Sequence, residues 1–225
     1  MTLTLTKNEG RWGWFFLAAQ FLLIPTLVTA VCPTLGIRTE ADLNLCCFFL
    51  EACLGAFLFR ELLRRSLRSC AGRWGKILLT ALEGFGLYFL VSTAVLWLIL
   101  LLRPDFSNIN DAGVNALIDQ RPLLMSLGVV FAAPLAEECL FRGWIFTGLA
   151  QKSLPLAYTV TTLTFSLIHT LGYIGTCDAM TLALCTMQYL APAAVLCWVC
   201  HKSDSLYGPL LLHIIINTLA LFTTR

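Results

Sequence analysis

Ionisable and amide side chains recur inside the apolar stretches of the C-terminal half of this chain, at spacings that fit helices. Glu137, Glu138 and Arg142 lie within two helical turns, and the four-residue step from Glu138 to Arg142 favours an ion pair on one helix face. Glu137 points about 100° away from Glu138 and has no partner in its own helix. This asymmetry predicts different roles for the two glutamates.

Two further apolar stretches each carry a pair of residues four positions apart, Phe165 with His169 and His213 with Asn217. Glutamate, histidine and asparagine can supply the general base and the oxyanion donors of a hydrolysis reaction. The alternative interpretation is an interhelical hydrogen-bond network that only holds helices together. Two glutamates, an arginine, two histidines and an asparagine exceed what packing requires, so we favour a catalytic site.

The composition indicates that these residues lie in a membrane protein. Of 225 residues, 58% are hydrophobic and 12% are charged, and this charged share is about half that of a soluble domain. A helix crosses the bilayer with about 20 residues, and the long apolar runs fit helices rather than barrel strands. We therefore predict an all-α, polytopic transmembrane bundle, a single domain over residues 1–225. The seven expected spans are 14–31, 43–59, 77–102, 123–150, 154–174, 179–200 and 206–222.

Loop charges predict the orientation of these spans. Segment 60–76 carries six basic residues and one acid, so the positive-inside rule places it, and with it the N-terminus, in the cytoplasm. Segment 103–122 is rich in loop-forming residues, which indicates an outer surface segment with a short interfacial helix. A chain this short without an endoplasmic-reticulum retrieval signal suggests a bacterial inner membrane.

The expected partners are the lipid bilayer and a peptide or protein substrate at the membrane. Nucleic acid is not expected, because the net charge is only +2 and the basic residues gather in one loop. Cys197 and Cys200 form a CxxC beside His201, but the second pair that a structural zinc site needs is missing. Cys32 and Cys177 fall in loops on the same predicted side, where a structural disulfide is conceivable.

The motifs themselves resemble a known family. EExxxR (Glu137, Glu138, Arg142), FxxxH (Phe165, His169) and HxxxN (His213, Asn217) are similar, in this order and on separate spans, to the three motifs of the CPBP intramembrane proteases. This family joins type II CAAX prenyl endopeptidases to bacteriocin-processing and bacteriocin-immunity proteins. The resemblance covers residues 123–222, the expected catalytic core, whereas residues 1–122 share only hydropathy with the family.

The resemblance implies an intramembrane endopeptidase in which Glu137 and His169 activate a water molecule. His213 and Asn217 would then stabilise the oxyanion, and Glu138 with Arg142 would orient the site. We expect no cofactor. A zinc-dependent enzyme is the alternative, because Glu137, His169 and His213 form a His2Glu ligand set.

Two other function classes compete with a protease. A non-catalytic scaffold or bacteriocin-immunity protein of the same fold is disfavoured by the complete motif set, and a small transporter by the lack of paired broken helices. Glu51 and Glu83 are single acids in the second and third spans, and we interpret each as a packing or cavity residue. Ser126 and Ser166 lack a nucleophile motif, and Asp178 lacks the second aspartate of an aspartyl protease.

Overall fold

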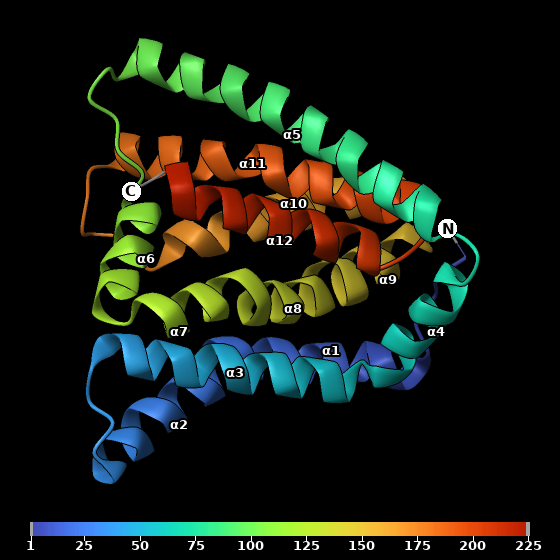
Figure 1. Ribbon diagram of the computed structural model, residues 1–225, viewed down its shortest axis with the longest axis horizontal. Coiled ribbons are helices and arrows are strands. Elements are labelled where there is room, and N and C mark those ends of the chain that lie inside the picture. Colours follow the sequence, from blue (N-terminus) through green and yellow to red (C-terminus); the bar gives the residue numbers. More distant parts are fainter. Residues whose placement is uncertain (1, 224–225) are drawn as a thin grey trace.

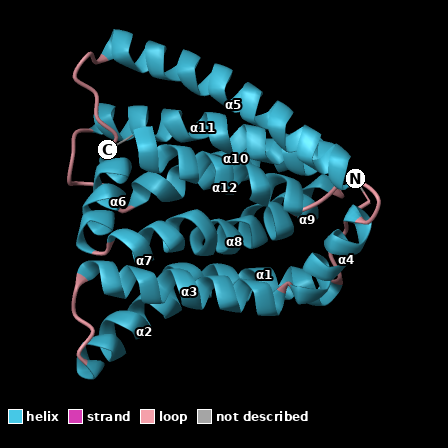
Figure 2. Cartoon of the chain, in the orientation of Figure 1, coloured by secondary structure: helices cyan, strands magenta, loops and turns pink. Residues whose placement is uncertain are grey.

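The computed structural model, which describes residues 2–223, is a bundle of long helices joined by short loops (Figures 1 and 2). Six helical stretches are long and apolar enough to span a membrane, and α12 adds a shorter apolar helix. The predicted all-α bundle of about seven spans is therefore confirmed. The six stretches are Lys7–Leu35, Glu40–Leu58, Trp74–Leu102, Pro122–Ala150, Leu154–Leu171 and Ala179–Ser203, and α12 is Tyr207–Thr223.

Two of the spans consist of several helical segments. The first runs through α1 (Lys7–Ala18), a π-helical turn (Ala19–Leu23), α2 (Ile24–Val31) and a 3₁₀ turn (Cys32–Leu35). The fourth runs through α7 (Pro122–Leu127), a π-helical turn η3 (Gly128–Ala132), α8 (Ala133–Glu137), a second π-helical segment η4 (Glu138–Phe146) and α9 (Thr147–Ala150). The other spans are α3 (Glu40–Leu58), α5 (Trp74–Leu102), α10 (Leu154–Leu171) and α11 (Ala179–Ser203). π-Helical turns occur preferentially at functional sites.

Two shorter helices lie at opposite ends of the bundle (Figure 1). α6 (Ile109–Gln120) confirms the short helix predicted in segment 103–122. The basic segment, which we expected to be a loop, instead forms α4 (Arg60–Cys70). It is amphipathic, with Leu62, Ser66 and Cys70 buried at four-residue intervals. We refer below to the α6 end and the α4 end.

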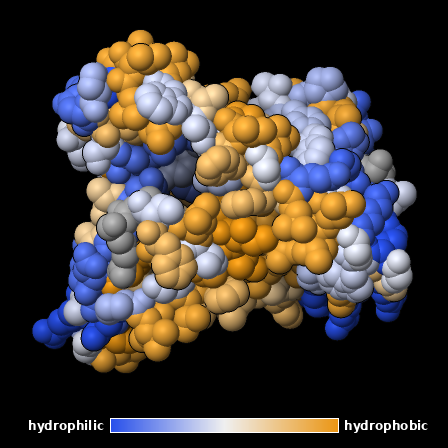
Figure 3. All heavy atoms as spheres, turned by 45° about the horizontal axis from the view of Figure 1, so that its top comes forward, coloured by the Kyte–Doolittle hydropathy of each residue, from blue (hydrophilic) through white to orange (hydrophobic). Residues whose placement is uncertain are grey.

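The outward faces of the long helices are apolar. Large side chains such as Leu90, Trp97 and Leu101 are more than half exposed, and Figure 3 shows hydrophobic side chains gathered over the middle of one face, with hydrophilic residues toward the ends. Exposure of this extent is unfavourable in water but matches the hydrocarbon core of a bilayer. The structure therefore supports an integral membrane protein.

Hydrogen bonds tie the loops at the α6 end to the helices. Arg103, after α5, forms an ion pair with Asp178 at 2.9 Å, and Asp178 caps α11 by accepting a hydrogen bond from the Thr181 amide. The hydrogen bonds from Thr181, together with Arg103, hold the pKa of Asp178 below its usual range. Asp178 is therefore a helix cap rather than an intramembrane aspartate.

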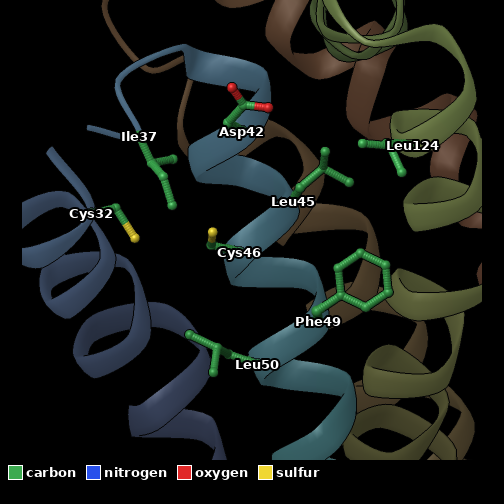
Figure 4. Close-up of a pocket in the computed structure, with 8 residues that line it drawn as sticks. All are labelled: Cys32, Ile37, Asp42, Leu45, Cys46, Phe49, Leu50 and Leu124. Carbon is green, nitrogen blue, oxygen red and sulfur yellow. The ribbon is translucent and has the colours of Figure 1, made fainter. Parts of the chain in front are cut away.

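Cys32 and Cys177 are both free thiols, so the conceivable disulfide between them is absent from this structure. Cys32 instead lines an apolar groove of about 640 Å³ between the first span and α3, where Cys46 also lies (Figure 4). The groove is lined by Cys32, Ile37, Asp42, Leu45, Cys46, Phe49, Leu50 and Leu124. None of these is a candidate site residue.

Close approach of α5 to α11 depends on Gly84. A methyl group added at Gly84 would lie 2.4 Å from Cγ2 of Val199, so either the Val199 side chain or the helices must shift to relieve the contact. We expect Gly84→Ala to destabilise the protein by about 1 to 3 kcal/mol, measured by thermal unfolding in detergent. Gly86→Ala is the matched control, because nothing lies within 4 Å of its added Cβ. Equal melting temperatures for the two variants would contradict this packing.

Candidate active site

The centre of the site is a chain of buried ionisable side chains that joins η4 to α12. Arg142 Nη1 donates to Glu138 Oε1 at 2.9 Å, and the same oxygen accepts a hydrogen bond from His213 Nδ1 at 2.8 Å. The predicted Glu138–Arg142 ion pair is therefore confirmed. Both side chains are almost completely buried, with relative exposures of 3% and 0%, so neither charge is solvated by water.

Arg142 is held by two further contacts. Its Nη2 donates to the backbone oxygen of Ala193 on α11 at 3.1 Å, and its guanidinium lies 4.5 Å from the centre of the Phe165 ring on α10. The guanidinium thus links three helices through one side chain. This geometry fits the orienting role predicted for the Glu138–Arg142 pair. Arg142 holds the Glu138 carboxylate, and that carboxylate in turn holds His213.

Glu137 lies beside this chain with one oxygen uncommitted. Its Oε2 is 3.7 Å from His213 Nε2, too far for a hydrogen bond, and among the described residues this buried oxygen has no hydrogen-bond partner. Glu138 differs in that its Oε1 is tied by both Arg142 and His213, although its Oε2 also has no hydrogen-bond partner among the described residues. The two adjacent glutamates therefore have different environments, as their helix positions predicted.

His169 reaches the site from α10 in a defined orientation. Its Nδ1 lies 2.7 Å from the carbonyl oxygen of Phe165, which can only accept, so Nδ1 carries the proton and Nε2 is left with a free lone pair. The imidazole contacts the Phe165 ring at 4.6 Å between centroids, and the Phe165 ring in turn lies 5.9 Å from His213. Phe165 is thus the centre around which Arg142 and both histidines are arranged.

Asn217 lies one helical turn beyond His213 on α12, but its observed hydrogen bond is to the backbone. Nδ2 donates to the carbonyl oxygen of Val129 in the π-helical turn η3, at 2.9 Å. A side-chain amide has a second N–H, which this contact does not use. The observed contact joins α12 to the fourth span and is the kind of interhelical hydrogen bond that the structural alternative describes.

The EExxxR motif begins where the fourth span changes from α-helix to π-helix. Pro134, near the start of α8, has no N–H to donate, and the wider turns of η4 leave backbone carbonyls that need other partners. The Thr147 hydroxyl donates to the Arg142 carbonyl, five residues earlier, at 2.7 Å. Trp144 Nε1 donates to the Gly10 carbonyl on α1 at 3.1 Å and anchors the segment to the first span.

Two glutamates outside the motifs, Glu51 and Glu83, differ in burial and in their contacts. Glu83 forms an exposed ion pair with Lys202 at 2.7 Å, so its interpretation as a packing or cavity residue is wrong. Glu51 is buried on α3 and interacts electrostatically with Glu137. A Cβ added at Gly55, one turn further along α3, would lie 3.5 Å from Cβ of Cys139 in η4, which places Glu51 on the side of α3 that faces the fourth span.

Sequence reasoning missed an aromatic and polar group at the α6 end of the site. The Tyr189 ring on α11 stacks on His169, with centroids 4.3 Å apart and planes at 23°, and its hydroxyl contacts Asn110 and Asp111 on α6. Polar residues grouped in segment 108–111 were the available signal, but nothing in their spacing indicated Tyr189 as their partner.

The positions of the donor atoms bear on the zinc alternative. Within residues 2–223, no three or more histidine, cysteine, aspartate or glutamate side chains are arranged to hold a metal ion. Glu137, His169 and His213 supply suitable donor atoms but do not converge on one point in this structure. The set does not fit a metal ion as it stands, so no step below is routed through one.

Comparisons with known proteins agree with the motifs. Residues 119–219 match the family model described as type II CAAX prenyl endopeptidase Rce1-like. The chain is also 27% identical over 135 residues to UPF0177 protein YxdF of Lactococcus lactis subsp. lactis (strain IL1403), an alignment that covers 58% of this chain and 68% of that protein. No solved structure matches the chain. The match supports a membrane protease at the level of the family, and the similarity of residues 119–219 to the Rce1-like model agrees with the CPBP resemblance of the motifs.

Proposed function

We propose that this protein is an intramembrane endopeptidase that hydrolyses a peptide bond of a membrane-associated peptide or protein without a metal cofactor. The observation that carries the proposal is the contrast between the two adjacent glutamates. Glu138 is fixed through Oε1 by Arg142 and His213, whereas Glu137 makes only a 3.7 Å approach to His213. The Oε2 atom of each glutamate is buried and has no hydrogen-bond partner among the described residues. A carboxylate that is positioned but not paired is what a general base requires.

In the proposed reaction, Glu137 removes a proton from a water molecule while the Nε2 lone pair of His169 accepts a hydrogen bond from the same water. The water oxygen attacks the carbonyl carbon of the scissile bond, and the carbonyl oxygen becomes an oxyanion. Glu137 then transfers its proton to the departing nitrogen as the C–N bond breaks. The oxyanion collapses to a carbonyl in the same step. The products are a carboxylic acid, which keeps the second proton of the water, and an amine, and Glu137 is again a carboxylate.

His213 and Asn217 are the proposed oxyanion donors. Glu138 holds His213 Nδ1 at 2.8 Å and so fixes the ring, whose Nε2 lies 3.7 Å from Glu137 Oε2. Asn217 would contribute the amide N–H that Val129 does not use.

The proposed setting is a bacterial inner membrane, with the α4 end and the N-terminus in the cytoplasm and α6 outside. The six basic residues of segment 60–76 support this orientation, and the similarity to a Lactococcus lactis protein supports a bacterial source. Residues 1–225 form the proposed single domain, and residues 123–222 its catalytic core.

The test is cleavage of defined peptides by the full chain, purified and reconstituted into nanodiscs. Peptides that end in a CAAX sequence, with and without a prenyl group, would be compared with an apolar peptide of equal length, and products read by mass spectrometry. We expect cleavage to persist in the presence of a zinc chelator, and elemental analysis to show no stoichiometric zinc. Absence of cleavage for every membrane peptide tried would instead favour a non-catalytic scaffold. In such a scaffold, the role of Asn217 would be its hydrogen bond to Val129, which joins two helices.

A further inference from the structure

The imidazole of His169 is in contact with two aromatic rings from different helices. Phe165, on its own helix, lies at 4.6 Å between centroids with planes at 41°, and Tyr189 on α11 stacks on it at 4.3 Å and 23°. The Phe165 carbonyl holds Nδ1 at 2.7 Å. The direction of the free Nε2 lone pair is therefore set by one hydrogen bond and two ring contacts. Only the Tyr189 contact comes from outside α10.

The Tyr189 ring is itself held by α6. Its hydroxyl donates to Asp111 Oδ1 at 2.6 Å and accepts from Asn110 Nδ2 at 2.8 Å. The neighbouring residue of α11, Gln188, accepts from Asn108 Nδ2 at 2.9 Å. Two hydrogen bonds at one phenol oxygen fix the direction of the ring, because the donor and acceptor directions of a hydroxyl are distinct.

The α6 helix, which holds the Tyr189 hydroxyl, is capped at its start and closely packed against its neighbours. Asn108 caps it by accepting from the amides of Asn110 and Asp111. Gly113 approaches Tyr173, in the loop after α10, so closely that an added Cβ would lie 2.7 Å from the Tyr173 hydroxyl. Asp111 is also partly buried, and this burial raises its pKa although the Tyr189 hydrogen bond acts in the opposite direction. A short surface helix thus packs closely against the end of the helix that carries His169.

We infer that Tyr189, fixed by Asp111 and Asn110 of α6, is a positioning residue that aims the Nε2 lone pair of His169 at the attacking water. The inference rests on the proposed function, because it assigns His169 a role in activating that water. The inference links α6 to the site through Tyr189, which lies outside the three motifs. Most of α6 precedes residues 119–219, the region that matches the family model. Tyr189 does not itself take part in the chemistry.

The kinetic test uses Tyr189→Phe, which keeps the stacked ring and removes only the hydroxyl. Displacements of an ångström or less in catalytic groups have large effects on rate, so we expect kcat to fall about 5- to 20-fold with KM unchanged. Asp111→Asn should give a similar loss, and the double variant should lose no more than Tyr189→Phe alone, because both remove the same support. Tyr189→Leu, which removes the ring, should lose about 100-fold or more.

A second readout is independent of peptidase activity. Diethyl pyrocarbonate modifies imidazole nitrogen, and the chain has only three histidines, so peptide mass spectrometry can follow the rate at each. We expect His169 to react about threefold faster or more in Tyr189→Leu, because the ring that covers it is gone. Tyr158 and His201 form a matched pair outside the site, with Tyr158 Oη 3.3 Å from His201 Nδ1. Tyr158→Phe should change the reaction of His201 and leave kcat and His169 unchanged.

The two readouts separate the inference from the proposed function. If the wild-type chain cleaves no peptide, the proposed function fails, while the modification rates still decide whether Tyr189 covers and fixes His169. The inference is overturned if Tyr189→Phe has wild-type kcat, or raises only KM, in a wild-type chain that does cleave. It is also overturned if His169 reacts at the wild-type rate in Tyr189→Leu.

Discussion

Glu137→Gln is expected to reduce kcat for peptide cleavage at least about 100-fold, while expression and melting temperature stay near those of the wild type. Glutamine keeps the volume of the side chain but cannot take a proton from water. Stability should not change, because among the described residues the buried Oε2 of Glu137 accepts no hydrogen bond that the substitution could break. The measurement is initial cleavage rate in nanodiscs, together with thermal unfolding of the same preparation.

Glu83→Gln is the matched control for this experiment. Glu83 also lies on a spanning helix, but its carboxylate pairs with Lys202 at the exposed α4 end of α5, so its loss should leave the cleavage rate unchanged. His169→Ala should resemble Glu137→Gln in activity. Wild-type turnover by Glu137→Gln would refute the assignment of Glu137 as the base, and release of stoichiometric zinc from the variant would replace it with the metal-dependent alternative.

Arg142→Ala is expected to lower the stability of the protein by about 3 to 5 kcal/mol, because it leaves the buried Glu138 carboxylate without its cation. The variant also loses the hydrogen bond to the Ala193 carbonyl and the contact with the Phe165 ring. Chemical or thermal unfolding in detergent would measure the loss, and the yield of folded protein should fall in parallel. Cleavage activity should fall as well, since His213 is positioned through Glu138.

Arg60→Ala is an unusually close control for that change. Arg60 also lies over a phenylalanine ring, at 4.7 Å from the centre of Phe57, also donates to a backbone carbonyl and also neighbours a glutamate. Its side chain, however, is 52% exposed, so its removal should change stability by no more than about 0.5 kcal/mol. If Arg142→Ala and Arg60→Ala had equal melting temperatures, the buried Glu138–Arg142 pair would not stabilise the protein as its geometry indicates.

The sequence was sufficient to predict the spans because hydropathy and helix length alone decide which segments cross a membrane. It also predicted the Glu138–Arg142 contact, since a four-residue step within one helix needs no knowledge of its neighbours. The helical form of α4 was missed for a related reason. We interpreted this segment as a loop because of its many charges. Leu62, Ser66 and Cys70, however, recur at the spacing of a buried helix face.

The rest of the site depends on contacts between helices that no local pattern contains. The shared acceptor Glu138 Oε1, which binds both Arg142 and His213, exists only because α12 packs beside η4. The η4 segment likewise has partners outside the fourth span, such as the Gly10 carbonyl that accepts a hydrogen bond from Trp144. Tyr189 lies in the apolar sequence of α11, and no local pattern indicates that its hydroxyl forms hydrogen bonds with α6.

The order of the charged groups along the chain has a consequence for how the protein enters the membrane. Glu138 and Arg142 are partners within one helix, so this pair can enter lipid with its charges balanced before later helices exist, and only Glu137 is left without a partner in the fourth span. His213 is carried by α12, which follows all of the other spans in the chain. The second contact of Glu138 therefore forms only after α12 has been synthesised and docked. Under the proposed function, a ribosome-bound intermediate that lacks α12 would also lack both oxyanion donors, His213 and Asn217, and should not cleave peptides during its own insertion.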